Sequence, residues 1–568
     1  MKVKVADYIV DFFIQKGITD VFGYPGGMVT HLMEALRQKE HSIKAHVNYH
    51  EQAAAFCACG YAQASGIPGI AYATSGPGAT NLITGICNAY FDSIPTIFIT
   101  GQVNTFESKN DLGVRQRGFQ ETDIVSMING VTKYSCYIAD ERFIKQELNK
   151  CWYIANEGRK GPVLLDIPMN IFRAIIDLEE CPDFKAPEKK EQSAHVDEII
   201  KMLCHSKRPA LLVGAGAKNQ RSRCLIKKFL KKFPIPTVSS MPAVDVLEHD
   251  HPLYFGFIGA YGNRTANFIA AKCDLLLAMG TRMDVRQIGA KKENFAPNAK
   301  LIRVEIDSGE LTNKIKEDEI QIFGGLDGLI EQILEQGGAA CEYQDWLNVC
   351  NHIKNELNDI DSRMPNRMIA GISREISEDV IITIDVGQNQ VWVSQSFETK
   401  PGQQILFSGG HGAMGYSLPA AIGAYYAKRT KVISFNGDGG IQMNIQELQF
   451  IAREKLPITI VIFNNYALGM IRHFQEMYFD HHYYQTVASA GYSVPSFRKI
   501  AEAYDIRYYA LRSEEDVRKI DWDLEEPQIV EVILTENTYV YPKLEFGKPN
   551  QDQEPLLNRD LYKELMEL

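Results

Sequence analysis

Short apolar runs alternate with amphipathic segments of helical period along most of the chain. Apolar runs that stop at Gly, Asn or Asp are typical of strands in a parallel sheet, and the segments between them are typical of the helices that cover it. The pattern therefore predicts an α/β protein built from doubly wound parallel sheets.

The expected strands fall into three groups. They are 69–74, 95–100 and 162–167 in the first group, with helices at 51–64 and 79–90; 210–214, 237–239, 274–279 and 301–306 in the second; and 380–385, 431–435, 458–463 and 528–534 in the third.

Two polar or small-residue stretches, 183–193 and 337–340, are typical of linkers between these groups. We expect an N-terminal domain over 1–180, a central domain over 190–340 whose first regular element starts at residue 208, and a C-terminal domain over 360–540. We expect the Pro-rich, charged tail over 541–568 to be irregular and to fold over a site or an interface.

Composition narrows the class of partner. The 568 residues carry a formal net charge of −11, which disfavours binding to nucleic acid or to an anionic membrane because both select basic surfaces. The longest apolar run, 456–463, is too short to cross a bilayer, and residues 1–7 lack the apolar segment of a secretory signal. None of the 11 cysteines forms a CxxC pair. We therefore expect a cytoplasmic protein with reduced cysteines.

The strongest chemical signal follows two strands of the third group. Strand 431–435 leads into NGDGG at 436–440, and strand 458–463 leads into Asn464 and Asn465. Strand ends of this kind meet at the ligand-binding edge of an open α/β sheet. A carboxylate and an amide oxygen suit Mg²⁺, and the glycines allow backbone N–H groups to approach a diphosphate. Each segment alone would be an ordinary turn, whereas the pair favours a metal–diphosphate site.

A second signal is Glu51, at the start of an expected helix. Alone it would be an ordinary helix N-terminal acid. Together with the metal motif and the loop ATSGPGATN at 73–81, it resembles the motif set of thiamine diphosphate (ThDP) enzymes. The resemblance implies that Glu51 contacts the aminopyrimidine ring and relays a proton. It also implies that Asp438, the Asn465 side chain and the Ala467 carbonyl bind Mg²⁺.

The same resemblance implies three ThDP-enzyme domains: one that binds the pyrimidine, one central, and one that binds the diphosphate and metal. Met414 would hold the cofactor in a bent shape. The implied ThDP-binding residues are Tyr24, Pro25, Gly26, Thr74, Asn81, Val386, Gly387, Gln388, Asn389, Gly412, Met414, Gly437, Asp438, Gly439, Gly440, Asn465, Ala467, Leu468, Gly469 and Met470.

Within this superfamily the chain is most similar to acetolactate synthase (acetohydroxyacid synthase) catalytic subunits, over about residues 4–541. The segments that carry the similarity are FGYPGG at 22–27, YATSGPGATNL at 72–82, DSIP at 92–95, GFQET at 118–122 and GPVLLDIP at 161–168. The similarity implies that pyruvate is decarboxylated and its two-carbon unit joined to a keto acceptor, with Phe119 and Gln120 beside the substrate. It also implies a homodimer or homotetramer whose active site lies between subunits.

The central group of strands resembles the FAD-binding domain of that family. The segments LVGAGA at 212–217, GTRMDVR at 280–286 and EID at 305–307 carry the resemblance. The residues implied to bind FAD are Gly214, Ala215, Gly216, Gly280, Arg282, Asp284, Arg286, Glu305, Ile306 and Asp307. One departure is AYG at 260–262, where the family has Met-His-Gly.

Further departures lie on the acceptor side of the expected site. Met169 and Asn170 stand where the family has Lys-Asp, Asn389 stands in place of a His, and His473 and Phe474 stand in place of Gln-Trp. Arg282, which can pair with an acceptor carboxylate, is kept. The implied substrate residues are Arg282, Met169, His473 and Phe474.

These departures leave the acceptor open. Pyruvate or 2-ketobutyrate is the first expectation, and a nucleotide-linked keto-sugar is the alternative. Two more functions stay open at this point. One is a simple decarboxylase or oxidase, for which His46, His50, His411 and His473 could serve, and the second is a cofactor-binding protein without turnover.

Overall fold

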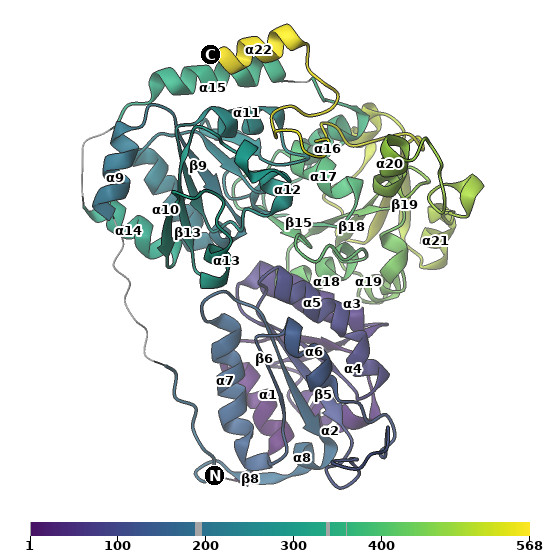
Figure 1. The fold of residues 1–568 in the computed structure, drawn as a ribbon. Coiled ribbons are helices and arrows are strands. Elements are labelled where there is room, and N and C mark those ends of the chain that lie inside the picture. Colours follow the sequence, from purple (N-terminus) through teal and green to yellow (C-terminus); the bar gives the residue numbers. More distant parts are fainter. Residues whose placement is uncertain (1, 188–195, 337–340, 359) are drawn as a thin grey trace.

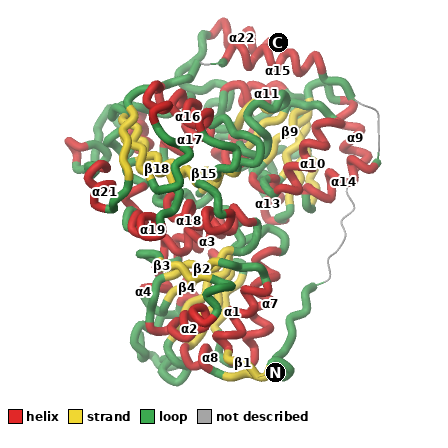
Figure 2. Tube along the Cα trace, turned by 180° about the vertical axis from the view of Figure 1, so that it is seen from behind, coloured by secondary structure: helices red, strands yellow, loops and turns green. Residues whose placement is uncertain are grey.

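The structure is a computed structural model that describes residues 2–187, 196–336, 341–358 and 360–568. Three six-stranded sheets, each parallel throughout, are flanked by helices (Figure 1). The view from behind shows the same layering in all three (Figure 2). The predicted fold class is therefore confirmed.

The N-terminal sheet has the strand order β3-β2-β4-β5-β7-β6. Its strands are β2 (Asp20–Gly23), β3 (Lys44–Val47), β4 (Gly69–Ala73), β5 (Thr96–Gln102), β6 (Tyr134–Tyr137) and β7 (Pro162–Pro168), while β1 (Lys2–Lys4) pairs antiparallel with β8 (Ile175–Asp177). Its helices are α1 (Val5–Gln15), α2 (Thr30–Gln38), α3 (Glu51–Ser65), α4 (Pro77–Asn81), α5 (Ile83–Phe91), α6 (Ile124–Ile128), α7 (Ile144–Asn156) and α8 (Met169–Arg173).

The central sheet has the order β11-β10-β9-β12-β13-β14. Its strands are β9 (Pro209–Val213), β10 (Thr237–Ser239), β11 (Tyr254–Phe257), β12 (Leu275–Met279), β13 (Lys300–Glu305) and β14 (Ile320–Phe323). Its helices are α9 (Val196–His205), α10 (Gln220–Lys232), α11 (Arg264–Lys272), α12 (Val285–Ile288), α13 (Ser308–Thr312), α14 (Leu326–Glu335) and α15 (Gln344–Leu357).

The C-terminal sheet has the order β16-β15-β17-β18-β20-β19. Its strands are β15 (Ile381–Ile384), β16 (Gln404–Phe407), β17 (Val432–Gly437), β18 (Ile458–Asn464), β19 (Arg507–Leu511) and β20 (Gln528–Ile533). Its helices are α16 (Met364–Glu375), α17 (Gln388–Ser396), α18 (Ser417–Lys428), α19 (Glu447–Glu454), α20 (Gly469–Tyr478) and α21 (Phe497–Ala503), and the tail ends in α22 (Arg559–Glu567).

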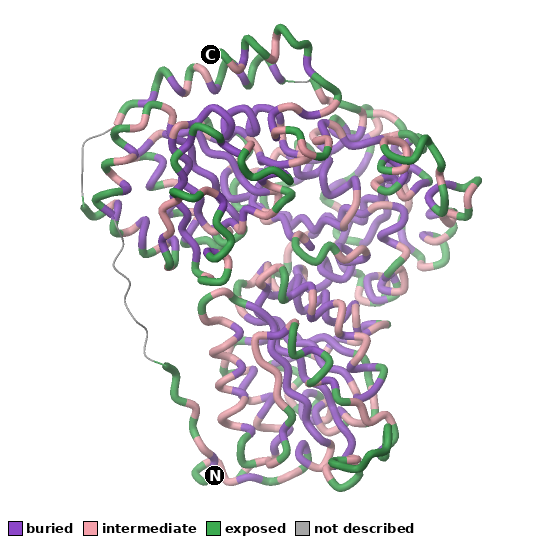
Figure 3. Tube along the Cα trace, viewed as in Figure 1, coloured by how far each residue is buried: buried purple, intermediate pink, exposed green. Residues whose placement is uncertain are grey.

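Interior strands were the predictable part of this fold, and Figure 3 shows why: the strands are largely buried, whereas exposed residues lie on the outer helices and loops. Each strand expected from an apolar run is present, within one or two residues of its predicted bounds. The predicted helix at 79–90 is instead two helices that meet at Leu82. The predicted linker at 337–340 and most of the one at 183–193 lie outside the described residues.

One expectation about chain organisation was wrong, and a second holds only in part. The central unit begins with the amphipathic helix α9, ahead of residue 208. The tail is irregular over 541–558, where Leu544 N donates to Ala260 O and Lys543 and Glu554 form an antiparallel bridge, but it ends in the helix α22. Apolar side chains on and before α22 pack against the central helices, which explains why a charged segment folds.

The N- and C-terminal domains meet through α3 and α18. Two glycines let the helices approach closely: a Cβ on Gly60 would lie 2.7 Å from Ala420 Cα, and a Cβ on Gly423 would lie 2.7 Å from the carbonyl carbon of Cys57. No larger residue fits at either position without moving one helix.

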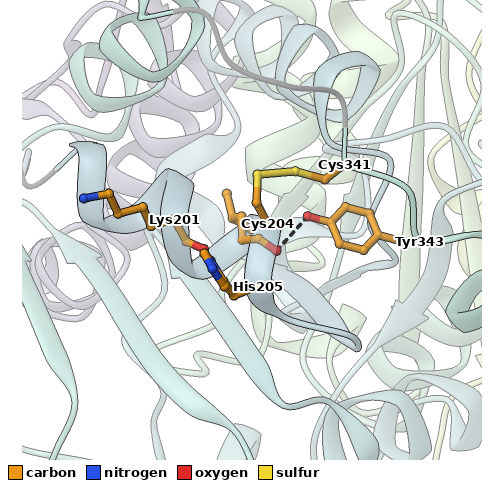
Figure 4. Close-up of a disulfide and its surroundings, with 6 residues drawn as sticks. Lys201, Cys204, His205, Cys341 and Tyr343 are labelled. Carbon is orange, nitrogen blue, oxygen red and sulfur yellow. Dashed lines mark hydrogen bonds between the residues drawn. A yellow bond between two sulfur atoms is a disulfide. The ribbon is translucent and has the colours of Figure 1, made fainter.

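The cysteines also depart from expectation. Cys204, at the end of α9, and Cys341, ahead of α15, form a disulfide across a sequence separation of 137 residues (Figure 4). The expectation of reduced cysteines is therefore wrong for this pair, and the cysteine pattern no longer argues for a reducing compartment. The other nine cysteines are free.

Among the described residues no helix is both long and apolar enough to span a membrane.

Candidate active site

The predicted metal residues gather at the carboxyl ends of β17 and β18. These strands pair in parallel with Gly437 opposite Phe463, and Asp438 N donates to Phe463 O at 3.3 Å. Asp438, Asn465 and Ala467 are all at least 96% buried. The loop that follows β18 therefore covers Asp438.

Asp438 has unused acceptor capacity. Its Oδ1 accepts from Tyr492 OH at 3.2 Å, whereas its Oδ2 is buried and has no hydrogen-bond partner. Burial raises the pKa of Asp438 to about 7, although the N–H groups of Gly439, Tyr466 and Ala467 act in the opposite direction. A buried oxygen left without a partner costs free energy, so this carboxylate suits a cation ligand.

The chemistry of this donor set fits Mg²⁺ bound with a diphosphate. No group of three or more His, Cys, Asp or Glu side chains suited to a metal occurs in the described part of the chain. A metal at this edge would therefore use one carboxylate together with amide, carbonyl, phosphate or water oxygens, as Mg²⁺ commonly does. Asn465 is held in place, because its Nδ2 donates to Gln388 Oε1 at 3.0 Å.

Close backbone packing shapes the space beside this edge. A Cβ on Gly439 would lie 3.3 Å from Met414 Cε and 2.9 Å from Leu468 Cδ2, and a Cβ on Gly469 would lie 2.8 Å from Asn465 Nδ2. The structure thus brings together Met414, Gly439, Leu468, Gly469 and Asn465, all of which are predicted ThDP-binding residues.

Glu51 lies at the start of α3 and is only 8% exposed. Asn81 Nδ2 donates to Glu51 Oε2 at 2.9 Å, and a Cβ on Gly78 would lie 3.2 Å from Oε1. Thr74 Oγ1 accepts from Met28 N at 3.2 Å. The structure therefore places Glu51 inside the 74–81 loop, with its carboxylate oriented by an amide.

Other predicted ThDP residues of this domain flank the same loop. A Cβ on Gly26 would lie 2.6 Å from Thr74 Cγ2, so the 24–26 turn packs on the loop that surrounds Glu51. Tyr24 and Pro25 are exposed. Gln120 has a positive φ of 63° and its backbone packs on Gly76, whereas the Phe119 side chain is 79% exposed. Phe119 therefore makes little contact within its own chain.

The predicted acceptor-side residues divide into two kinds. The Asn170 side chain holds a neighbouring loop: its Oδ1 accepts from Thr105 N at 2.8 Å, and its Nδ2 donates to Thr105 Oγ1 at 3.0 Å. His473 stacks on Tyr539, just ahead of the tail, with 4.2 Å between the ring centroids, and burial lowers the pKa of His473 to about 4. Phe474, half exposed, packs on its own helix at Tyr478. Met169 is partly buried.

The predicted FAD residues line a cavity of about 440 Å³ in the central domain. The predicted residues in its lining are Ala215, Gly216, Gly280, Arg282, Asp284, Arg286, Glu305 and Ile306. Gly214 and Asp307 lie outside the lining. Gly214 packs against the Gly280–Thr281 backbone, and the Asp307 carboxylate accepts from Arg159 Nη1 at 2.9 Å.

Several residues around these sites were not assigned a role from the sequence. Asp92 and Arg159 of the N-terminal domain also line the central cavity. Asp92 accepts from Gly409 N at 3.1 Å and Gly410 N at 2.6 Å, and burial raises its pKa to about 6. Asp92 lies in the DSIP segment that resembles the family, so a signal existed; for Arg159 and Tyr492 we find none.

Comparison with known proteins places the chain in a family. Models described as "Thiamine pyrophosphate enzyme" match it in three parts: the N-terminal TPP binding domain at residues 3–127, the central domain at 196–333 and the C-terminal TPP binding domain at 385–532. The chain is 34% identical to the acetolactate synthase large subunit of Lactococcus lactis, over 94% of this chain and 92% of that protein.

Two further relatives agree. The Escherichia coli acetolactate synthase isozyme 2 large subunit is 33% identical over 96% of this chain and 98% of its own length. The probable acetolactate synthase large subunit of Methanocaldococcus jannaschii is 34% identical over 94% and 91%. These matches, together with the three parallel sheets, show that the chain belongs to the thiamine pyrophosphate enzymes and, within them, to the acetolactate synthase large-subunit family.

Proposed function

We propose that the chain is a ThDP- and Mg²⁺-dependent carboligase that decarboxylates pyruvate and joins the two-carbon unit to a second pyruvate or to 2-ketobutyrate. The observation that carries the proposal is the buried Asp438 Oδ2 without a partner, beside Asn465 and Ala467 at two neighbouring strand ends. The relatives named acetolactate synthase large subunits support the choice of reaction.

In this proposal Asp438, Asn465 and the Ala467 carbonyl would hold Mg²⁺, which would supply positive charge for the diphosphate. When bound, ThDP supplies an acidic carbon that adds to a keto group and accepts the electron pair left by CO₂. Glu51 holds a proton at the aminopyrimidine side, where Asn81 orients its carboxylate. Burial of Glu51 keeps bulk water away from that proton.

We further propose that the two half-sites combine across subunits of a homodimer or homotetramer. Glu51 and Asp438 lie in different domains, and the loop over 105–121 presents four exposed apolar side chains: Phe106, Leu112, Val114 and Phe119. Apolar side chains exposed together are typical of an interface. Light scattering of the purified protein tests this: a monomer that retains full activity would contradict it.

We propose that the central cavity binds FAD. Its glycines allow close backbone approach, since a Cβ on Gly216 would lie 3.0 Å from Gly280 Cα. Glu305 Oε1 accepts from Ile306 N at 3.0 Å, which fixes an acid at a strand end where a ribose hydroxyl can donate. Protein expressed with ample riboflavin should show visible flavin absorption; a colourless protein that takes up no added FAD would contradict the assignment.

The reaction is tested with purified protein, labelled pyruvate, ThDP and Mg²⁺, with product analysis by mass spectrometry. We expect acetolactate. Release of CO₂ without acetolactate would reject the acceptor, and 2-ketobutyrate and a nucleotide-linked keto-sugar in parallel reactions would then locate it. Glu51→Gln should lower kcat by about 10²- to 10⁴-fold, the usual contribution of a proton-transfer group. The matched control is Glu40→Gln, at an exposed acid, which should have no effect.

A further inference from the structure

A second cavity, of about 580 Å³, lies between the central and C-terminal domains and shares no lining residue with the first. Its walls come from β11, the first turn of α11, the last turn of α15, the helix α16, the end of α17 and Tyr541–Pro542 of the tail. The volume is within the range of small-molecule sites. Neither the proposed carboligase reaction nor the proposed FAD site uses this cavity.

Basic side chains outnumber acidic ones around it. Three acids line the cavity, and each is paired with an arginine: Asp361 with Arg264, Glu514 with Arg367, and Glu398 with Arg374. Two further basic residues, Lys354 and His249, also line it. The paired acids leave a positive excess in the cavity.

Lys354 supplies that excess charge. Among the described residues it has no carboxylate partner, and its Nζ lies 5.6 Å from the ring centroid of Phe255 in the cavity wall. The side chain is exposed, yet the protein around it lowers the pKa of Lys354 by desolvation. Exposure together with desolvation indicates a side chain in a concavity, where a charge is screened less than on an open surface.

Two helices begin at the cavity without side-chain caps. Asn263 precedes α11 and Arg363 precedes α16, and neither side chain accepts a first-turn N–H. Uncapped N-termini attract anions. Independently, Asn366 lines the cavity in the first turn of α16 and is only 7% exposed; its Nδ2 donates to Ser396 Oγ, whereas its Oδ1 has no partner. A ligand hydroxyl could supply the missing donor.

Aromatic rings complete the wall: Tyr254, Phe255, Phe397 and Tyr541. We propose that the cavity binds a phosphate ester of nucleotide or sugar-phosphate size, with the phosphate at Lys354 and the two helix N-termini and a hydroxyl at Asn366. Such a ligand bridges two domains, so its binding fastens the central domain to the C-terminal domain.

The tail connects this cavity to α20. Tyr541 lines the cavity, and Tyr539, two residues earlier, stacks on His473 of α20. A bound ligand therefore fixes the tail beside the helix that carries Phe474. An effect of this ligand on the keto acceptor that the enzyme uses would rest on the proposed function, whereas binding of the phosphate ester to the cavity does not.

Binding is measured by calorimetry on protein saturated with ThDP, Mg²⁺ and FAD, so that the cofactor sites are already filled. The probes are ADP, ribose 5-phosphate and inorganic phosphate. We expect ADP or ribose 5-phosphate to bind at least tenfold more tightly than inorganic phosphate, and the tighter of the two identifies the source of the phosphate. No binding of either ester, or equal binding of all three probes, would overturn the proposal.

Variants locate the site. Lys354→Met should weaken binding at least tenfold and Lys354→Arg should restore it, whereas Lys228→Met, at an exposed lysine of α10 outside the lining, should not change it. Ala370→Phe fills the cavity from α16 without removing a charge, and should also abolish binding. Full affinity in both Lys354→Met and Ala370→Phe would place the ligand elsewhere and reject the inference.

Discussion

Gly423→Ala tests whether close packing of α3 on α18 positions the catalytic acid. The added Cβ would lie 2.7 Å from the carbonyl carbon of Cys57 and 2.8 Å from Tyr61 N, and an ordinary contact begins at 3.4 Å. Both atoms belong to the backbone of α3, so neither can rotate away. The helices must separate by well over about 0.7 Å to reach that ordinary contact distance, because the Cys57 carbonyl oxygen lies even nearer to the added Cβ than these two atoms do.

The displacement reaches the proposed site because α3 begins at Glu51. A misplacement of about 1 Å costs roughly 10²-fold in rate when a reacting group must be aligned. We therefore expect kcat to fall by roughly ten- to a hundredfold, and overpacking to cost about 1–3 kcal/mol of stability.

The measurements are steady-state kcat and KM for pyruvate and the unfolding midpoint in denaturant. Gly328→Ala in α14 is the matched control, because its Cβ would meet nothing within 4 Å; alanine there should be neutral or stabilise by about 0.5–1 kcal/mol. A Gly423→Ala protein with wild-type stability and wild-type kcat would show that the helix contact does not set the geometry.

Three further predictions concern other parts of the chain. Cys204→Ser opens a loop of 137 residues and should lower the unfolding free energy by up to about 5 kcal/mol. Wild-type protein in reductant should be as unstable as this variant. Wild-type denaturation curves that are the same with and without reductant would contradict a stabilising disulfide. Because burial lowers the pKa of His473 to about 4, the unfolded chain binds a proton that the folded chain does not between about pH 6.5 and 4. Stability should therefore fall as the pH drops through that window, less so in His473→Phe than in His205→Phe, as urea melts will measure. Asp438→Asn should weaken ThDP binding at least tenfold, measured by equilibrium dialysis as Mg²⁺ is titrated. Unchanged ThDP binding would show that the metal is held elsewhere.

The sequence predicts the interior of this fold better than its edges. Strands such as β12 and β18 are buried on both faces, so they appear as continuous apolar runs. None of the six edge strands, β3, β6, β11, β14, β16 and β19, was predicted, and β19, for example, mixes Arg507 with partly buried tyrosines. The interior strand β2 was missed as well, so strand position decided most, but not all, of what the hydrophobic pattern could show.

In the candidate site, too, residues that follow interior strands could be predicted, and contacts between domains could not. Asp438 and Asn465 follow interior strands, so their neighbourhood could be inferred from sequence. Contacts between domains could not: Arg159 meets Asp307 across 148 residues, and Asp92 accepts from Gly409 N and Gly410 N of the C-terminal domain. No local pattern encodes such a pair, because it depends on how separately folded domains dock.

The Cys204–Cys341 bridge places two positions near opposite ends of the central domain at a Cα–Cα distance of 5.5 Å. The chain thus returns close to where it entered this domain before α15, the last helix of the domain, leads on to the C-terminal domain. The outer two domains dock directly through α3 and α18, so the middle one resembles an insert rather than a spacer. In such an arrangement the middle domain, together with the ligand that it binds, can be replaced during evolution without changing how the outer two domains pack against each other.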